Sequence, residues 1–289
     1  MKILMLLIAL LFSAITIQAQ NQGLVFDSKT LHSNILNMER TYSIYLPAGY
    51  ESSELTYPIL YLLHPAGPSN TVPNQQSWYY YGGLKHYLDT AIESGEITPM
   101  IVVTPDANFE TKRISYWNDP DGDFNFENFF FEEFIPHIEK NYHCRTERDS
   151  RALAGASLGG AAVIQYIQHN PEKFSIACAL AGAVRKYDYE YLIKRYPNVT
   201  ENRLIEWYKP YDVFEYYENL PDDTESRIKL YISCGDDDHL SPNNVMLHTA
   251  LKNKGIEHEF RIQNGGHDWS YWRSVTPEFI RFISNSFIK

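Results

Sequence analysis

Short apolar runs alternate along this chain with longer segments whose apolar positions repeat at helical spacing. The alternation predicts an α/β fold, with a mostly parallel central sheet and helices on both faces. The predicted strands are a half-exposed one at 41–47, buried ones at 57–64, 100–106 and 151–157, two more at 175–182 and 227–235, and a last one within 258–267. The predicted helices are 126–142, 158–170, 242–255 and the tail from Pro277.

One segment, 183–226, does not follow this alternation. It is rich in tyrosine, contains Trp207 and separates two predicted strands by more residues than a simple crossover needs. Two interpretations stay open: the segment shapes the rim of an active site, or it is a surface excursion that does not contact substrate.

Residues 1–19 have the layout of a secretory signal peptide, with Lys2, an apolar run from Ile3 to Phe12, and small residues up to Ala19. The run is shorter than the roughly 20 residues of a membrane-spanning helix, which disfavours an anchor. The sequence therefore predicts cleavage after Ala19, export to the periplasm or the cell exterior, and one mature domain, 20–289.

Composition narrows the range of partners. The hydrophobic fraction of 44% is enough for the core of one large domain, and the net charge of −11 argues against nucleic acid and anionic membranes as partners. Aromatic residues make up 15% of the chain, and its 22 tyrosines suit stacking on sugar or phenolic rings, although tyrosines also cover ordinary surfaces. Nothing in the sequence indicates an oligomeric state.

The three cysteines, Cys144, Cys178 and Cys234, are too few and too scattered for a disulfide framework. Cys178 and Cys234 lie in apolar strand-like runs, which favours buried free thiols. One bridge stays possible in an oxidising compartment.

The stretch "RALAGASLGG" (151–160) carries the first candidate for chemistry, because Ser157 stands where a buried strand meets a helix. Gly155 and Gly159 complete a Gly-x-Ser-x-Gly pattern, which in this context predicts a nucleophile elbow. The small neighbours let the serine occupy a strained turn, and the helix that follows directs its first N–H groups toward an oxyanion. The alternative is tight helix–strand packing without catalysis.

A serine nucleophile needs a base and an acid that orients the base. The stretch "SCGDDDHL" (233–240) places three aspartates after a strand, and "NGGHDWSYW" (264–272) places His267 on a Gly-Gly turn. The order serine, aspartate, histidine is that of the α/β-hydrolase triad. The pattern therefore predicts Ser157 as nucleophile and His267 as base, with the acid among 236–238.

An upstream loop, "YLLHPAGPSN" (61–70), is the candidate for the second half of an oxyanion hole. The predicted donors are the N–H groups of Leu158, directly after the nucleophile, and of Ala66, with Gly67 as the alternative to Ala66. Pro65 has no N–H and cannot donate. His64 is interpreted as a residue that orients this loop.

The stretch "NDPDGDFNFEN" (118–128) has the alternating oxygen ligands of a calcium loop at Asp119, Asp121, Asp123 and Asn125. Its glycine stands at the fourth position instead of the sixth, and no glutamate stands at the twelfth. A solvated acidic loop near the site is therefore favoured, and no metal and no cofactor are predicted.

Several stretches occur together in the order of a known family: "YLLH", "PMIVVTPDA", "FENFF…FIPHIEKNY", "RALAGASLGG", "CGDDD" and "GGHDWSYWR". From about Thr41 to its end the chain resembles the esterase D-like family, and within it the secreted feruloyl and acetyl xylan esterases. The family also includes enterochelin esterases, S-formylglutathione hydrolases and mycolyltransferases.

The resemblance implies an α/β-hydrolase fold and assigns the acid to Asp238, with Asp236 and Asp237 as loop or capping residues. Trp269 and Trp272 match the family's His-x-Trp-x-x-Trp pattern. They are interpreted mainly as packing around the histidine loop, with a possible role in substrate binding that Trp117 would share. Pro65 departs from the family, which usually has glycine after the loop histidine.

The expected function is that of an exported serine esterase, which removes feruloyl or acetyl groups from plant cell-wall polysaccharide such as xylan. The alternatives are a siderophore esterase or acyltransferase on the same fold, and a hydrolase-fold binding module that has lost catalysis.

Overall fold

The computed structural model describes residues 22–66, 72–110, 113–185, 189–221 and 227–287. The expected signal peptide, 1–19, lies outside these residues, so it stays a prediction. Among the described residues, no helix combines the length and the apolar character that crossing a bilayer requires. Cys144, Cys178 and Cys234 are buried free thiols, as their apolar surroundings suggested for the last two.

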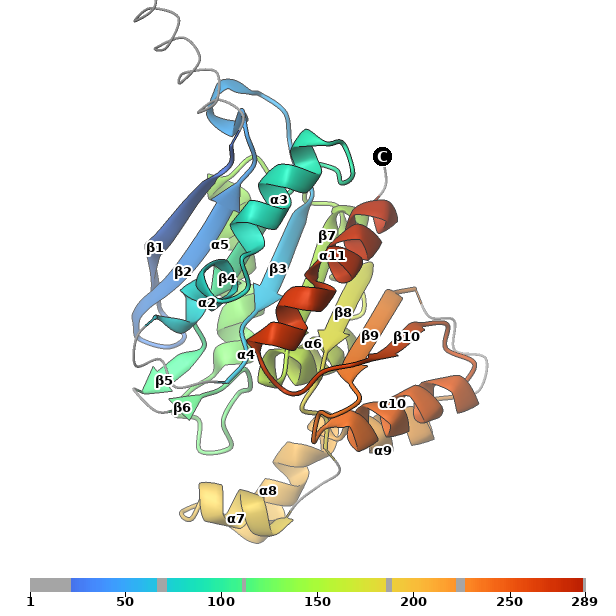
Figure 1. The fold of residues 1–289 in the computed structure, drawn as a ribbon. Helices are drawn as coiled ribbons and strands as arrows, with labels where there is room; N and C mark the ends of the chain where they lie inside the picture. The colour runs from blue at the N-terminus through green and yellow to red at the C-terminus, as the bar shows by residue number, and fades with distance from the viewer. Residues whose placement is uncertain (1–21, 67–71, 111–112, 186–188, 222–226, 288–289) are drawn as a thin grey trace, which may run out of the picture.

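An eight-stranded sheet forms the centre of the molecule (Figure 1). Its strand order is β1-β2-β4-β3-β7-β8-β9-β10; β1 and β2 pair antiparallel at one edge, and all strands from β4 onward are parallel. The strands span Leu24–Ser33 (β1), Met38–Leu46 (β2), Ile59–Leu63 (β3), Ile101–Pro105 (β4), Arg151–Ala156 (β7), Ile176–Leu180 (β8), Lys229–Gly235 (β9) and Glu259–Gln263 (β10), and a separate hairpin pairs Asn108–Glu110 (β5) with Arg113–Ile114 (β6). Because the parallel strands run in one direction, the loops after them meet at one edge of the sheet.

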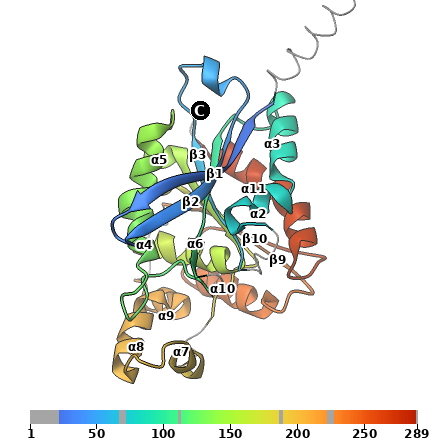
Figure 2. The ribbon, with the colours of Figure 1, turned by 90° about the vertical axis from the view of Figure 1, so that its left-hand side faces the viewer.

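Helices cover both faces of the sheet (Figure 2). One face packs against Ser77–Tyr80 (α2), Leu84–Glu93 (α3) and Trp269–Ser286 (α11). The other packs against Phe126–Asn128 (α4), Ile135–Asn141 (α5), Leu158–His169 (α6), Val213–Asn219 (α9) and Ser241–Asn253 (α10). Each face therefore has its own apolar core, and the predicted α/β architecture is confirmed.

The last helix begins earlier than predicted. The sequence placed its start at Pro277, but α11 begins at Trp269 and contains Pro277 in its interior. The Asp268 carboxylate caps it by accepting hydrogen bonds from the N–H groups of Ser270 and Tyr271. Proline inside a helix costs about 3 kcal/mol, but the apolar positions of α11 on both sides of Pro277 are buried in the core, and this burial offsets the cost.

The predicted helix at 126–142 forms, but in three parts. A π-helical turn, Phe129–Phe134 (η3), joins α4 to α5, and Pro136 follows at the start of α5. A proline at the start of α5 lacks an N–H that the first turn of a helix does not need. The π turn before it has more residues per turn than an α-helix, so it changes the spacing of side chains between α4 and α5.

Within the segment 183–226, the residues that the structure describes form three helices, Tyr189–Arg195 (α7), Glu201–Tyr208 (α8) and α9, and a 3₁₀ turn, Lys209–Tyr211 (η5). Helices α7 and α8 lie beyond the edge of the sheet in both views (Figures 1 and 2) and share a small apolar core of Leu192, Tyr196 and Leu204. We call 183–226 the insertion.

Helix α6 approaches the sheet unusually closely at its first turn. A Cβ built at Gly159 would lie 2.7 Å from the carbonyl oxygen of Leu63 and 2.8 Å from that of His64, and one at Gly155 would lie 2.6 Å from the carbonyl oxygen of Gly159. These opposing atoms are backbone atoms that cannot rotate away, so the close approach requires glycine at both positions.

We therefore expect Gly159→Ala to destabilise the fold by about 1–3 kcal/mol, the usual range for an overpacked core. Urea unfolding followed by circular dichroism measures the loss. Gly266→Ala is the control, because a Cβ at Gly266 meets its nearest atom at 3.8 Å. Equal stability of the two variants would contradict the close approach.

Candidate active site

Ser157 occupies a strained turn between β7 and α6. Its backbone has φ 55° and ψ −116°, a conformation that residues with a Cβ rarely adopt. Backbone hydrogen bonds hold it there: its N–H donates to the Leu180 carbonyl at 2.9 Å, and its own carbonyl accepts from the Ala183 N–H at 2.8 Å. The turn is the predicted nucleophile elbow, with the side chain at the carboxyl end of a central strand.

The structure brings Ser157, His267 and Asp238 together. The His267 Nε2 lies 2.8 Å from the Ser157 Oγ, and its Nδ1 lies 2.7 Å from the Asp238 Oδ2. The Asp238 side chain is fully buried, and its Oδ1 accepts a hydrogen bond from the Leu240 N–H at 2.8 Å. Because the carboxylate can only accept, the His267 Nδ1 carries the proton, and Nε2 is left to accept one from the serine hydroxyl.

The structure also distinguishes the three adjacent aspartates. Asp236 and Asp237 are exposed, and the Asp236 Oδ1 accepts from the N–H groups of Asp237 and Gly265. Asp236 therefore links the loop after β9, which carries the three aspartates, to the loop after β10, which carries His267. Of the three aspartates, Asp238 is the one that bonds His267. A Cβ on Gly235 would lie 2.1 Å from the Gly265 carbonyl oxygen, so the two loops also touch through their backbones.

Trp269 and Trp272 pack around the histidine loop. The Trp272 ring meets His267 edge-on at 5.2 Å and is 4% exposed. Trp269 packs between Trp272 and Trp78, with ring centroids at 5.0 and 5.2 Å. Together with the Asp268 cap of α11, these contacts hold His267 against the serine.

The two predicted oxyanion donors belong to the elbow and to the loop after β3. The N–H of Leu158 is the first of α6, and Ala66 follows the end of β3 in an exposed position. Gly67, the alternative donor, lies outside the described residues. A carbonyl oxygen bound beside Ser157 would meet the positive end of α6.

His64 is a fully buried link between two loops. Its Nε2 accepts from the Ala107 N–H at 3.0 Å, so the ring proton sits on Nδ1, which donates to the Pro65 carbonyl at 3.0 Å. Burial lowers the pKa of His64, more than the Asp106 carboxylate raises it. This neutral ring fixes Pro65, which agrees with the loop-orienting interpretation.

Beside Leu158 lies a cavity of about 210 Å³ whose lining includes five aromatic rings and two arginines. Trp117, one of the residues predicted to bind substrate, is one wall, and the insertion supplies most of the others. The insertion residues that line it are Ala183, Arg185, Leu192, Arg195, Tyr196, Trp207, Tyr208 and Tyr211. Apart from the tyrosine-rich composition, no sequence signal identifies these side chains, because they meet through tertiary contacts. We call this cavity the aromatic pocket.

The polar atoms of the aromatic pocket's rings are bonded to neighbours. The indole N–H groups of Trp117 and Trp207 donate to Gln165 and to the Asn118 carbonyl, each at 2.5 Å. The hydroxyls of Tyr196, Tyr208 and Tyr211 donate to Asp119, the Arg185 carbonyl and Glu127. The pocket is therefore suited to a flat apolar or phenolic group.

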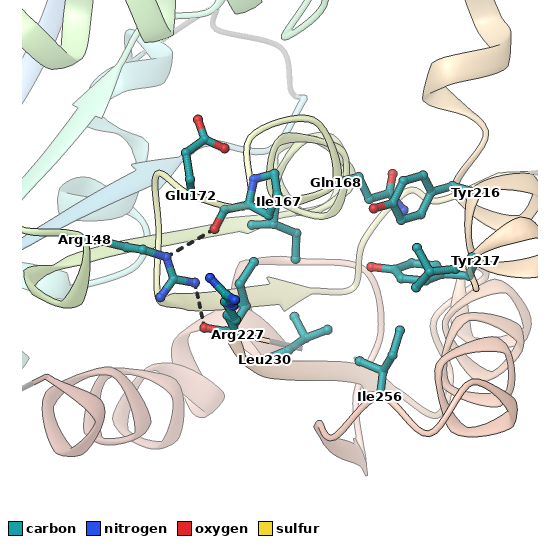
Figure 3. A pocket seen from close by; sticks show the side chains of 12 residues that line it. Arg148, Ile167, Gln168, Glu172, Tyr216, Tyr217, Arg227, Leu230 and Ile256 are labelled. Atoms are coloured by element: carbon teal, nitrogen blue, oxygen red, sulfur yellow. Dashed lines mark hydrogen bonds between the residues drawn. The ribbon is translucent and has the colours of Figure 1, made fainter. Parts of the chain in front are cut away.

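Figure 3 shows a second cavity, of about 430 Å³. Its lining includes Tyr217, Ile167 and Leu230, and Arg148 closes one side by donating to the carbonyl of Arg227. Neither the triad nor the predicted oxyanion donors contribute to it.

The acidic loop does not gather metal ligands. Asp119 is buried and accepts from the Tyr196 hydroxyl at 2.8 Å, and the Asp121 carboxylate accepts from the Asp123 N–H. Among the described residues, the group of side chains that could hold an ion is Asp238, His239 and His267. Two of these already bond each other, so a metal there would compete with the triad.

Comparisons with known proteins agree with this geometry. Residues 33–282 match the family model Esterase, described as "Putative esterase". An endo-1,4-beta-xylanase/feruloyl esterase of Xylanibacter ruminicola is 26% identical over 279 residues, 90% of this chain and 33% of that protein. An acetyl esterase of Caldicellulosiruptor saccharolyticus is 24% identical over 193 residues, 60% of this chain and 66% of that protein. A solved ferulic acid esterase is 31% identical with a TM-score of 0.80, covering 92% of this chain and 99% of that one.

The fold is that of the α/β-hydrolases, as the resemblance implied. More particularly, the chain belongs to the esterase family whose model it matches over 33–282. It spans about a third of the length of the xylanase/feruloyl esterase.

The hydrogen bonds of His64 make a direct prediction. Its ring should stay neutral, with the proton on Nδ1, as the pH falls below the ordinary histidine value of about 6.5. Imidazole ¹⁵N–¹H correlation spectra recorded from pH 8 to pH 5 measure this, and the signal is assigned by its absence in His64→Gln. Titration near pH 6.5 would contradict the buried acceptor geometry.

Proposed function

We propose that this protein is a serine carboxylic-ester hydrolase that removes feruloyl or acetyl groups from plant cell-wall polysaccharide. The observation that carries the proposal is the hydrogen-bonded series Ser157–His267–Asp238 beside the aromatic pocket. We further propose that the chain is exported, on the strength of the signal-peptide pattern at 1–19.

The geometry supports a two-step reaction. The Ser157 Oγ attacks the ester carbonyl carbon while His267 Nε2 takes the hydroxyl proton, and Asp238 stabilises the imidazolium. The N–H groups of Leu158 and Ala66 bind the oxyanion. When the carbonyl re-forms, the bond to the alcohol breaks, and the alcohol leaves with the proton from His267. Water, deprotonated by His267, then attacks the acyl-serine, which releases the acid and restores Ser157.

The aromatic pocket favours a feruloyl over an acetyl group. We expect a phenolic ring to lie in the cavity that Trp117, Trp207 and Tyr208 line, whereas an acetyl group would leave most of this cavity empty. The relatives named for feruloyl and ferulic acid ester hydrolysis support the same choice, and the acetyl esterase supports the smaller group. Turnover of methyl ferulate, acetylated xylan and a catecholate triester distinguishes these substrates from a siderophore ester.

We expect Ser157→Ala to lower kcat on any ester by roughly 10⁶-fold without changing the fold, because no other group can form the acyl-enzyme. Initial rates on p-nitrophenyl acetate measure the loss, and the melting temperature checks the fold. Ser270→Ala, a change at an exposed serine near the histidine loop, should keep full activity.

A fluorophosphonate should label the wild type at Ser157 and leave Ser157→Ala unlabelled. An unlabelled wild type would identify the chain as a binding module without catalysis.

The pocket walls predict a split between substrates. Trp207→Ala should lower kcat/KM for methyl ferulate about 5- to 30-fold, because the acyl ring loses a stacking partner, and should change p-nitrophenyl acetate hydrolysis little. Trp207→Phe keeps a ring face without the indole N–H and should retain most of the ferulate activity. Equal losses on both esters would show that Trp207 does not contact the acyl group.

A further inference from the structure

A partly buried ion pair fastens the insertion to the body of the molecule beside the aromatic pocket. The pair joins Glu127 of α4 to His169 at the end of α6, with the His169 Nδ1 2.7 Å from the Glu127 Oε1. The Glu127 side chain is 9% exposed and that of His169 20%. Both residues lie outside the triad and do not line the pocket.

Both members of the pair also bind the turn η5 of the insertion. The His169 Nε2 lies 2.8 Å from the Pro210 carbonyl oxygen, and the Tyr211 hydroxyl donates to the Glu127 Oε2 at 2.9 Å. The two ring nitrogens of His169 therefore face oxygens that can only accept. Satisfying both requires a proton on each nitrogen, which makes His169 an imidazolium.

From η5 the connection runs directly into the pocket walls. The Tyr211 ring lines the pocket and lies 5.4 Å from that of Trp207, and the Tyr211 carbonyl accepts from Gln165 at 2.9 Å. Gln165 in turn accepts from the Trp117 indole. Three of the aromatic walls thus depend on where η5 is held.

We propose that Glu127 and His169 are positioning residues for the acyl group: charged His169 clamps η5, and discharge of the ring releases it and weakens binding of aromatic acyl groups. The inference rests on the proposed esterase function and deepens it, since it gives the pocket a pH-dependent selectivity. Chemistry at Ser157 is unaffected, because neither residue contacts the triad.

Among the groups around His169, Glu127 is the charged group that shifts its pKa. Burial pulls the pKa of His169 down, but the hydrogen bond to Glu127 and its charge, with the Pro210 carbonyl, bring it above its ordinary value. The pKa values of Tyr211 and Tyr166, which pack around the pair from η5 and α6, are raised by burial and by Glu127, so both stay neutral. Lys209 of η5 pairs with Glu215 of α9 at the surface, 3.9 Å apart.

The sign of the pH effect follows from the raised pKa. His169 is charged below its folded pKa, which lies above the ordinary histidine value, so the clamp is complete below that folded pKa and is lost as the pH rises through it. A neutral ring keeps one proton and must give up either the bond to Glu127 or the bond to Pro210. The clamp residues bond each other and η5 rather than the triad, so loss of the clamp should not lower kcat.

The test measures binding separately from turnover. The dissociation constant of methyl ferulate for Ser157→Ala, followed by tryptophan fluorescence from pH 6 to pH 9.5, should rise about 5- to 30-fold on the alkaline side, in step with the ¹⁵N titration of His169. Adding Glu127→Gln should give weak binding at every pH. Adding His248→Gln is the control, because His248 bonds His258 and does not line the pocket, and it should leave the profile unchanged.

The kinetics of the wild type over the same pH range distinguish failure of the clamp from failure of the esterase function. We expect KM for methyl ferulate to rise with pH, KM for p-nitrophenyl acetate to stay unchanged, and neither kcat value to fall with the clamp. A dissociation constant that is flat across the His169 titration, or no binding at all, overturns the clamp even if the enzyme hydrolyses esters. Absence of turnover with pH-dependent binding overturns the esterase function instead.

If Glu127→Gln does not fold, Tyr211→Phe provides a second test, because it removes one hydrogen bond to the pair. It should raise the dissociation constant at neutral pH by less than Glu127→Gln would, and an unchanged value overturns the clamp.

Discussion

The contact between the first turn of α6 and the ends of β3 and β7 is the constraint on which the site depends. Gly155 and Gly159 let the helix backbone approach so closely that no side chain fits between them. The chain must then turn sharply at Ser157, which explains its positive φ and the outward direction of its hydroxyl. The same approach brings the N-terminus of α6 to the loop after β3, where an oxyanion would be bound.

Parallel strands make the rest of the triad possible. Ser157, Asp238 and His267 follow β7, β9 and β10, so all three lie at the carboxyl edge of the sheet although the serine and the histidine are 110 residues apart. Each loop has its own support: Asp236 joins the acid and histidine loops, and Asp268 caps the helix that follows the histidine. The geometry of the triad therefore depends on contacts between and after these loops, which sequence motifs do not describe.

The insertion supplies most of the lining of the aromatic pocket and none of the triad residues. Its aromatic side chains contribute most of the pocket beside Leu158, and the Glu127–His169 pair in the body of the fold bonds one turn of it. Under the proposed function, the reaction and the choice of acyl group depend on separate parts of the molecule, which is common where loops on a rigid scaffold set specificity.

The sequence by itself determined the parallel sheet, the elbow at Ser157 and the histidine turn, because strand periodicity, turn glycines and motif order are local properties. It narrowed the acid to three adjacent aspartates, and the resemblance selected Asp238, the one that bonds His267. It misplaced the start of α11, because burial on both sides of Pro277 outweighs the helix-breaking signal of a proline. The walls of the pocket and the Glu127–His169 pair were decided only by the tertiary structure. Glu127 and Tyr211 are 84 residues apart, and no periodicity or spacing in the sequence indicates that such distant side chains will form a buried hydrogen bond.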